Sequence, residues 1–235
     1  MKNMVHEGKS VQAISTSNSY VRITDLGNGK SQIDKFNKGG YIKERTKEKN
    51  AQLFANQLVT GPQSNPKKTT WLQMFTELDT NYSGNYTVYG FYSWLTDANN
   101  KKTDVIGLSH DSNVTFDDNA ITHNYYYWDN TENYLSDTYM TASSNGAHSA
   151  STGSYFEFPF NYWDTDVNHL PYGFIQVSAH KANSNALRSD ICFTYAHQQT
   201  VFSVTPTVSF SGFNIVVTPT DKFESPNDTL DAYLY

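Results

Sequence analysis

Residues 173–179 read GFIQVSA, and apolar and polar side chains alternate along them one by one. Successive side chains of a β-strand point to opposite faces of the sheet, so this period of two predicts a strand with one buried face. Asn-Ser-Asn at 183–185 turns the chain, and residues 187–196 return with Ile191, Phe193 and Tyr195 on one face. This part of the sequence decides the fold class in favour of β-structure.

Further strand signals lie on both sides of this segment. Aromatic and β-branched residues favour strands, and they are enriched at 86–95, 103–108, 120–128, 134–141, 201–210 and 213–218. The polar turn at 97–101 predicts that the first two of these strands pair as a hairpin. Strands at short, regular spacing are typical of an all-β protein, and we expect an antiparallel β-sandwich that resembles a jelly roll.

Two short segments show helical spacing instead. Ala51, Phe54, Ala55 and Leu58 form one apolar stripe, which predicts a helix over 42–59. Thr70 and Gln73 fit a capping box at the start of a second helix, expected over 70–78.

Charge divides the chain into two parts. Residues 1–68 hold 12 of the 17 Lys and Arg residues but 5 of the 23 Asp and Glu residues, a net charge of +7. The remainder has a net charge of −13. We therefore expect a basic, extended N-terminal arm over 1–68 and a β-sandwich body over 69–235.

The arm has few large apolar residues before position 53, so it has little with which to fold alone. One interpretation of its helix is that it packs on its own body, and the other is that it docks on a neighbouring subunit. The second interpretation predicts a homo-oligomer. The docking residues would be Lys43, Arg45, Lys47, Phe54 and Leu58.

Motifs for catalysis are absent from the sequence. The seven His residues lack metal-ligand spacing, the single Cys192 cannot form an internal disulfide, and no phosphate-binding or nucleophile motif occurs. We therefore expect no enzyme activity, no metal and no cofactor. No secretory leader or membrane-spanning stretch is visible, so we expect synthesis in a cytoplasm and no membrane association. A net charge of +7 beside an acidic body disfavours nucleic acid as a partner.

Two aromatic stretches are candidate contact sites for a sugar or a protein partner. The first contains Tyr126, Trp128 and Asp129. The second contains Tyr162, Trp163, Asp164 and Asp166, with Glu157 and His169 near it in sequence. Such residues can stack on sugars, and paired carboxylates can cleave a glycosidic bond or bind calcium. Alternatively the aromatic residues line the core and the carboxylates are solvated.

In its Asn-, Ser-, Thr- and Tyr-rich β body and basic arm, the chain resembles small β-sandwich proteins of bacteriophage particles. These include capsid, decoration, head-fibre and tail-ring components. The resemblance covers composition and organisation without a diagnostic motif, so no functional residues carry over. It implies a virion structural protein, made in the host cytoplasm, that contacts copies of itself and other virion proteins. The alternatives are a carbohydrate-binding β-sandwich that recognises a host-surface glycan, and a glycan-cleaving enzyme.

Overall fold

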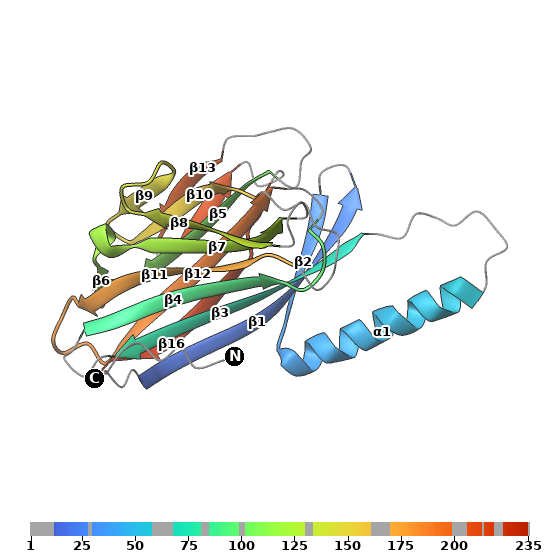
Figure 1. Ribbon diagram of the computed structural model, residues 1–235. Coiled ribbons are helices and arrows are strands. Elements are labelled where there is room, and N and C mark those ends of the chain that lie inside the picture. Colours follow the sequence, from blue (N-terminus) through green and yellow to red (C-terminus); the bar gives the residue numbers. More distant parts are fainter. Residues whose placement is uncertain are drawn as a thin grey trace.

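The computed structural model describes residues 12–27, 30–57, 68–80, 85–98, 102–129, 134–160, 170–198, 206–212, 214–218 and 223–234. In these residues the chain forms two antiparallel β-sheets that pack face to face, and a helix extends from one side (Figure 1). Helix α1 spans Lys38–Gln57, and a short 3-10 helix, η1, spans Asp118–Ala120. In this part of the chain, neither helix has the length and apolar content that crossing a membrane requires.

Sheet A is the larger sheet, with the strand order β2-β1-β3-β4-β11-β7-β8, and β6 pairs with β11. Its strands are β1 (Gln12–Gly27), β2 (Lys30–Phe36), β3 (Thr69–Thr80), β4 (Asn85–Trp94), β6 (Val114–Phe116), β7 (Thr122–Asp129), β8 (Tyr134–Thr141) and β11 (Tyr172–Lys181).

Sheet B has the order β15-β12-β5-β10-β9, and β16 pairs with β12. Its strands are β5 (Thr103–His110), β9 (Ala147–Ala150), β10 (Gly153–Pro159), β12 (Arg188–Gln198), β15 (Phe223–Glu224) and β16 (Asn227–Tyr233). A separate hairpin joins β13 (Thr207–Ser211) to β14 (Asn214–Thr218).

The core lies between the sheets. Strands of both sheets supply buried apolar side chains, among them Leu72, Met74 and Val88 from sheet A and Ile106, Phe156 and Phe193 from sheet B. Gly90 admits the ring of Phe193, because a Cβ on Gly90 would lie 2.3 Å from that ring. The missing side chain lets the sheets approach each other at this point.

The predicted antiparallel β-sandwich is confirmed. Strands β4, β5, β7, β10, β11 and β12 alternate between sheets A and B, a feature that jelly rolls share. The expected hairpin of residues 86–95 with 103–108 is wrong, because β4 lies in sheet A and β5 in sheet B. A polar loop as long as the one between β4 and β5 can join strands of two packed sheets as readily as it can join neighbouring strands of one sheet.

The helix expected over 70–78 is also wrong, because these residues belong to β3. Leu72, Met74 and Leu78 are buried while Gln73 and Phe75 are partly exposed, so the alternation of a strand prevails over the helical spacing. Strand β3 pairs with β1 on one side and with β4 on the other. Tertiary pairing therefore overrides the local capping signal.

The helix expected over 42–59 is present as α1, which begins four residues earlier. Asn37 caps it: its side-chain Oδ1 accepts from the main-chain N of Gly40 at 2.8 Å, and its carbonyl accepts from Tyr41 N at 2.9 Å. The side chain of Asn37 satisfies a main-chain donor that has no partner within the helix.

The extended arm is corrected for residues 12–36. These residues form β1 and β2, and β1 pairs with β3 from Gln12 to Thr24 inside sheet A. Main-chain hydrogen bonds form a ladder whether the side chains are polar or apolar, and Val21 and Ile23 add buried surface. The premise that residues 1–68 cannot order on their own chain is therefore wrong for this stretch. Residues 1–11 lie outside the described part.

A polar seam joins the first and last strands. Asp228 of β16 accepts hydrogen bonds from the hydroxyls of Ser17, at 3.0 Å, and Ser19 on β1. The main-chain N of Tyr233 donates to the hydroxyl of Ser15 at 3.1 Å. These contacts join the edge of sheet A to the edge of sheet B along one side of the sandwich.

Candidate binding surface

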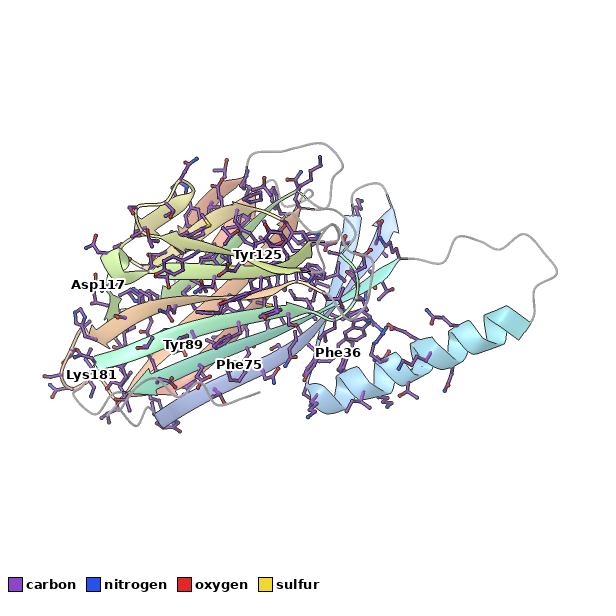
Figure 2. The ribbon with its side chains drawn as sticks, in the orientation of Figure 1. Phe36, Phe75, Tyr89, Asp117, Tyr125 and Lys181 are labelled. Atoms are coloured by element: carbon purple, nitrogen blue, oxygen red, sulfur yellow. The ribbon has the colours of Figure 1, made fainter. Side chains whose placement is uncertain are left out.

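The outer face of sheet A carries a row of aromatic rings on adjacent strands. We define the aromatic platform as Phe75 (β3), Tyr89 and Phe91 (β4), Tyr172 and Phe174 (β11) and Tyr126 (β7). Strand pairing places Phe75 opposite Phe91, Phe91 opposite Phe174 and Tyr172 opposite Tyr126. Phe75 and Tyr89 are labelled on neighbouring strands in Figure 2.

The rings of the platform contact one another in sequence across the sheet. The centroids of Phe75 and Phe91 are 5.7 Å apart, and those of Phe91 and Phe174 are 5.6 Å apart. Phe174 lies 6.5 Å from Tyr126, which stacks on Tyr172 at 4.9 Å. These distances are typical of paired aromatic side chains, which hold one another in place. Four strands thus present a continuous aromatic surface about 15 Å wide, given a strand spacing of about 4.8 Å.

The platform is accessible to solvent. Tyr172 is 40% exposed, and the other five side chains are partly exposed. On edge strand β8, Tyr139 is 59% exposed and pairs with Asn124, which extends the row beyond β7. Partly exposed aromatic rings supply contact area with few torsions to fix on binding.

Polar side chains lie between and beside the rings. Gln73, Asn124 and Gln176 occupy the same face and are partly exposed. Glu77 and Asp79 follow Phe75 on β3 at spacings of two, so both carboxyl groups point to the platform side. The surface therefore combines ring faces with hydrogen-bond donors and acceptors.

Burial, and then the charge of Asp79 beside it, together raise the pKa of Glu77 to about 7. Burial likewise raises the pKa of Asp79, although its hydrogen bond with Glu77 opposes this. Burial, then the charges of Asp79 and Glu77, raises the pKa of Tyr89. Two neighbouring carboxyl groups that hydrogen-bond each other share a proton near neutral pH.

Helix α1 bounds the platform at one end. Tyr41 of the helix stacks on Tyr20 of β1 at 4.6 Å and meets the edge of Trp71 at 5.0 Å. The Trp71 indole Nε1 donates to the carboxylate of Glu48 at 3.1 Å. Tyr20 of β1 pairs with Phe36 of β2 on one side and with Gln73 of β3 on the other. The part of the outer face of sheet A that the helix leaves uncovered begins at Gln73.

An ion-pair network strengthens this attachment. Arg22 of β1 contacts Asp34 of β2 at 2.8 Å and Glu44 of α1 at 3.0 Å. The guanidinium also lies 5.1 Å from the centroid of the Phe36 ring. The start of α1 is thus held on sheet A, while its distal part extends away from the sandwich (Figure 1).

The residues predicted for the first contact site are only partly placed. Tyr126 belongs to the platform, as its pairing with Tyr172 shows. Trp128 and Asp129 lie in β7, but their side chains are outside the described part.

The second predicted contact site lies almost entirely outside the described part. Tyr162, Trp163, Asp164, Asp166 and His169 fall in residues 161–169, which the structure does not describe. Glu157 is on β10 of sheet B, 3.7 Å from His148, so it does not join the platform.

The docking residues predicted on the helix are also partly placed. Lys43 and Lys47 are exposed on α1, and Lys47 pairs with Glu44 at 2.6 Å. Arg45 pairs with Glu48 at 2.7 Å, so its charge is engaged within the helix. Phe54 lies in α1 with its side chain outside the described part, and Leu58 lies beyond it.

A buried acid–base network occupies the core. Asp104 of β5 accepts from His197 Nδ1 at 2.8 Å and from the hydroxyl of Tyr195, and Trp94 Nε1 donates to that hydroxyl at 3.2 Å. Asp104, Tyr195 and His197 are all at most 1% exposed. The network therefore links the two sheets and offers no surface to a ligand. In the described residues, no group of three or more His, Cys, Asp or Glu side chains is placed to hold a metal ion.

Sequence reasoning missed most of the platform. The run at 86–95 is rich in aromatic residues, and Phe91 and Tyr92 are adjacent, so its two faces look alike in sequence. The structure buries Tyr92 and leaves Phe91 partly exposed. Which face is buried depends on how β4 pairs with β3 and β11.

Comparisons with known proteins do not assign the chain to a family. No protein-family model and no curated protein sequence matches the chain. The solved structures similar to it include the collagen-binding domain of a Staphylococcus aureus adhesin, at 10% identity and a TM-score of 0.35, covering 61% of this chain and 86% of that one. The collagen-binding subdomain ACE19 of the Enterococcus faecalis surface protein ACE has 8% identity and a TM-score of 0.32, covering 60% and 84%. A structure of manganese lipoxygenase of Gaeumannomyces graminis with part of zonadhesin of Komagataella pastoris has 11% identity and a TM-score of 0.31, covering 73% and 64%. All three TM-scores are below 0.5, so none of these similarities bears on function.

Proposed function

We propose that this protein is a carbohydrate-binding β-sandwich that holds an oligosaccharide along the aromatic platform of sheet A. The observation that carries the proposal is the row Phe75, Phe91, Phe174 and Tyr126, partly exposed and in ring contact across four strands. The carbon-bound hydrogens on one face of a sugar ring pack against an aromatic face. Successive rings can therefore hold successive sugar units.

The polar residues beside the platform can form hydrogen bonds with the hydroxyl groups of a sugar. Amide groups of Gln73, Asn124 and Gln176 can donate and accept hydrogen bonds, and Glu77 and Asp79 add acceptors at one end. A few placed polar groups among apolar ones provide orientation and specificity in ligand sites.

The charge of the platform argues against single-stranded nucleic acid, which also stacks on aromatic side chains. Proteins that bind nucleic acid this way line the groove with positive charge. The groups beside the platform on β3 are instead the carboxyl groups of Glu77 and Asp79. We assign a binding role to this surface and no catalytic step.

A glycan array followed by calorimetry with the best-bound oligosaccharide tests the proposal. Tyr172→Ala is expected to weaken binding at least tenfold, because it removes one stacking face and unpacks Tyr126. Tyr233→Ala is the matched control, since Tyr233 is 46% exposed but lies on β16 of sheet B. An array without any bound glycan, or equal affinity of both variants, would contradict the proposal.

A second candidate function, self-assembly through α1, is favoured by the exposed part of that helix. Ile42 is 54% exposed, and Lys43 and Lys47 are exposed beside it, while residues 69–235 have a net charge of −13. The basic helix is thus complementary to the acidic body of a second copy. Native mass spectrometry of the wild type and of Ile42→Glu with Lys43→Glu tests it, and a wild type that is monomeric at high concentration excludes it. The predicted role in a virus particle, with synthesis in a host cytoplasm, stays a prediction.

A further inference from the structure

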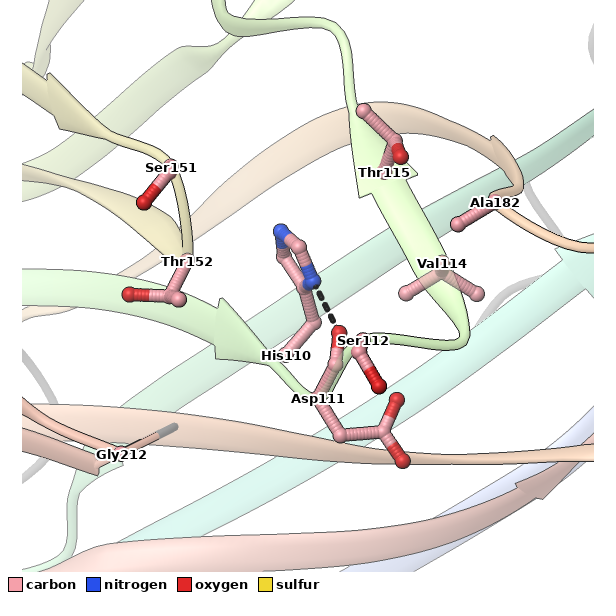
Figure 3. Close-up of a pocket in the computed structure, with 9 residues that line it drawn as sticks. All are labelled: His110, Asp111, Ser112, Val114, Thr115, Ser151, Thr152, Ala182 and Gly212. Carbon is pink, nitrogen blue, oxygen red and sulfur yellow. Dashed lines mark hydrogen bonds between the residues drawn. The ribbon is translucent and has the colours of Figure 1, made fainter.

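A pocket lies at the end of β5 (Figure 3). It is lined by the turn into β6, by β6 itself, by the β9–β10 turn, by Ala182 after β11 and by the turn of the β13–β14 hairpin. Its volume is about 470 Å³, within the range of sites for small molecules. His110 stands in the middle, with Val114 and Thr115 on one side, Ser151 and Thr152 on the other and Gly212 at the rim. The pocket shares no residue with the aromatic platform.

The hydrogen bond of His110 fixes which ring nitrogen faces the pocket as an acceptor. Its Nδ1 lies 2.6 Å from the main-chain carbonyl oxygen of Asp111. A carbonyl oxygen only accepts, so in the neutral ring Nδ1 carries the hydrogen and Nε2 has the lone pair. Figure 3 shows Nε2 directed away from Asp111, into the space between Thr115 and Thr152.

The surroundings hold this acceptor in place before any ligand arrives. The His110 ring packs on Phe116, with centroids 4.3 Å apart, and the residue is 4% exposed. The main-chain N of His110 donates to the carbonyl of Thr152 at 3.0 Å. The His110 side chain therefore loses little conformational entropy when a ligand binds.

The rest of the lining favours an uncharged ligand. Ser112, Thr115, Ser151 and Thr152 contribute hydroxyl-bearing side chains. The carboxylate of Asp111 accepts from Ser189 Oγ at 2.7 Å and from the main-chain N of Asn113 at 2.9 Å. Its other oxygen accepts from the main-chain N of Asp190 at 3.1 Å. Hydrogen bonds within the protein thus occupy the carboxylate of Asp111, the one charged side chain of the lining. The imidazole nitrogen of His110 alone does not supply enough ligands for a metal ion.

We propose that this pocket binds a small uncharged polyol, such as a monosaccharide, which donates a hydroxyl hydrogen to His110 Nε2. Hydroxyl groups of the lining, such as that of Ser151, can complete the hydrogen bonds of the polyol, and Val114 can pack against its carbon atoms. The inference does not depend on the function proposed for the platform.

Side-chain ¹⁵N NMR at pH 8, where histidine is neutral, tests the inference on the full-length protein. His110, assigned by its loss in His110→Asn, is expected to show a protonated Nδ1 and an unprotonated Nε2. Titration with D-glucose, D-galactose, N-acetyl-D-glucosamine and glycerol is expected to shift the Nε2 signal saturably for at least one of them.

Three variants make the result specific. Gly212→Asn is expected to weaken the response at least tenfold by narrowing the rim. At its φ of +63° asparagine is tolerated, and a Cβ there has no atom within 4 Å. His148→Asn, at an exposed histidine, and Phe91→Ala, on the platform, are expected to leave the response unchanged. A protonated Nε2, no shift with any of the four probes, or an equal response in Gly212→Asn would overturn the inference.

Discussion

The carboxylate of Asp228 on β16 accepts a hydrogen bond from the hydroxyl of Thr76 on β3, with the two oxygens 2.7 Å apart. Thr76 is on sheet A and Asp228 on sheet B, so the bond crosses the sandwich. Together with the serine hydroxyls of β1, it surrounds a carboxylate that is 3% exposed. A charged acceptor satisfied by three hydroxyls is thereby part of the contact between the sheets.

Asp228→Ala is expected to lower the free energy of unfolding by about 3 kcal/mol, because it leaves the buried hydroxyl of Thr76 and the partly buried hydroxyls of Ser17 and Ser19 without their acceptor. Asp231→Ala is the control on the same strand, where the carboxylate is 53% exposed and pairs with Arg188 at 2.7 Å. Its expected cost is about 0.5 kcal/mol. Urea titrations measure both, and equal losses would contradict a role for the seam.

Gly90→Ala is expected to destabilise the protein by about 2 kcal/mol, because the new methyl group would overlap the ring of Phe193. A double-mutant cycle with Phe193→Leu should show a coupling free energy of about 1 kcal/mol. Gly39→Ala is the contrasting change, since a Cβ there lies 3.6 Å from its nearest atom. It should stabilise α1 by about 0.5 kcal/mol. If the free-energy changes of the two substitutions simply added, the new methyl group at position 90 would not be in conflict with the ring of Phe193.

The stability of the protein should fall as the pH rises through neutrality. Burial raises the pKa of Glu224 to about 7 from 4.5, with Ser31 and His197 opposing the shift. Between those two values the folded state keeps a proton that the unfolded state has lost, so raising the pH destabilises the fold. Each pKa unit corresponds to about 1.4 kcal/mol, so the loss by pH 8 should be on the order of 3 kcal/mol.

Glu224→Gln should remove the part of the loss that Glu224 contributes, so the variant should be more stable than the wild type at pH 8 and similar to it at pH 4. A smaller loss should remain in the variant, because the pKa of Glu77 is also raised to about 7. Thermal unfolding across this range measures the difference. Asp231→Asn removes an exposed carboxylate instead and should keep the wild-type profile. A wild type as stable at pH 8 as at pH 5 would show that Glu224 finds a partner for its charge.

Tyr41→Ala should loosen α1 from sheet A. The ring contacts Tyr20 and Trp71, so its loss should speed trypsin cleavage after Lys43 and Lys47 roughly tenfold. Ile42→Ala, at the neighbouring exposed position, should leave the rate unchanged. Equal rates in both variants would mean that other contacts hold the helix.

Local sequence patterns located most strands but not their partners. The alternation at 173–179 predicts β11 within a few residues, and the strand signals at 201–210 and 213–218 predict β13 and β14. The split of β4 and β5 between two sheets depends on contacts that no local pattern encodes. Polar β1 was missed as a strand because its order comes from pairing with β2 and β3.

The candidate site could be anticipated only through Tyr126. Its neighbours in space come from positions 75, 91 and 174, on three other strands. Each of those strands has apolar residues on both faces, so the exposed one cannot be chosen from sequence alone. The acceptor nitrogen of His110 was equally invisible, because it depends on a hydrogen bond to a main-chain carbonyl.

The seam between β1 and β16 also constrains how the protein is made. During translation Ser17 of β1 leaves the ribosome 211 residues before Asp228 of β16. The serines of β1 therefore cannot form their hydrogen bonds with Asp228 until nearly the whole sandwich has been synthesised. Contacts between such distant positions raise the contact order, which slows folding. Closure of this side of the sandwich therefore depends on contacts between the two most distant strands and comes late in folding.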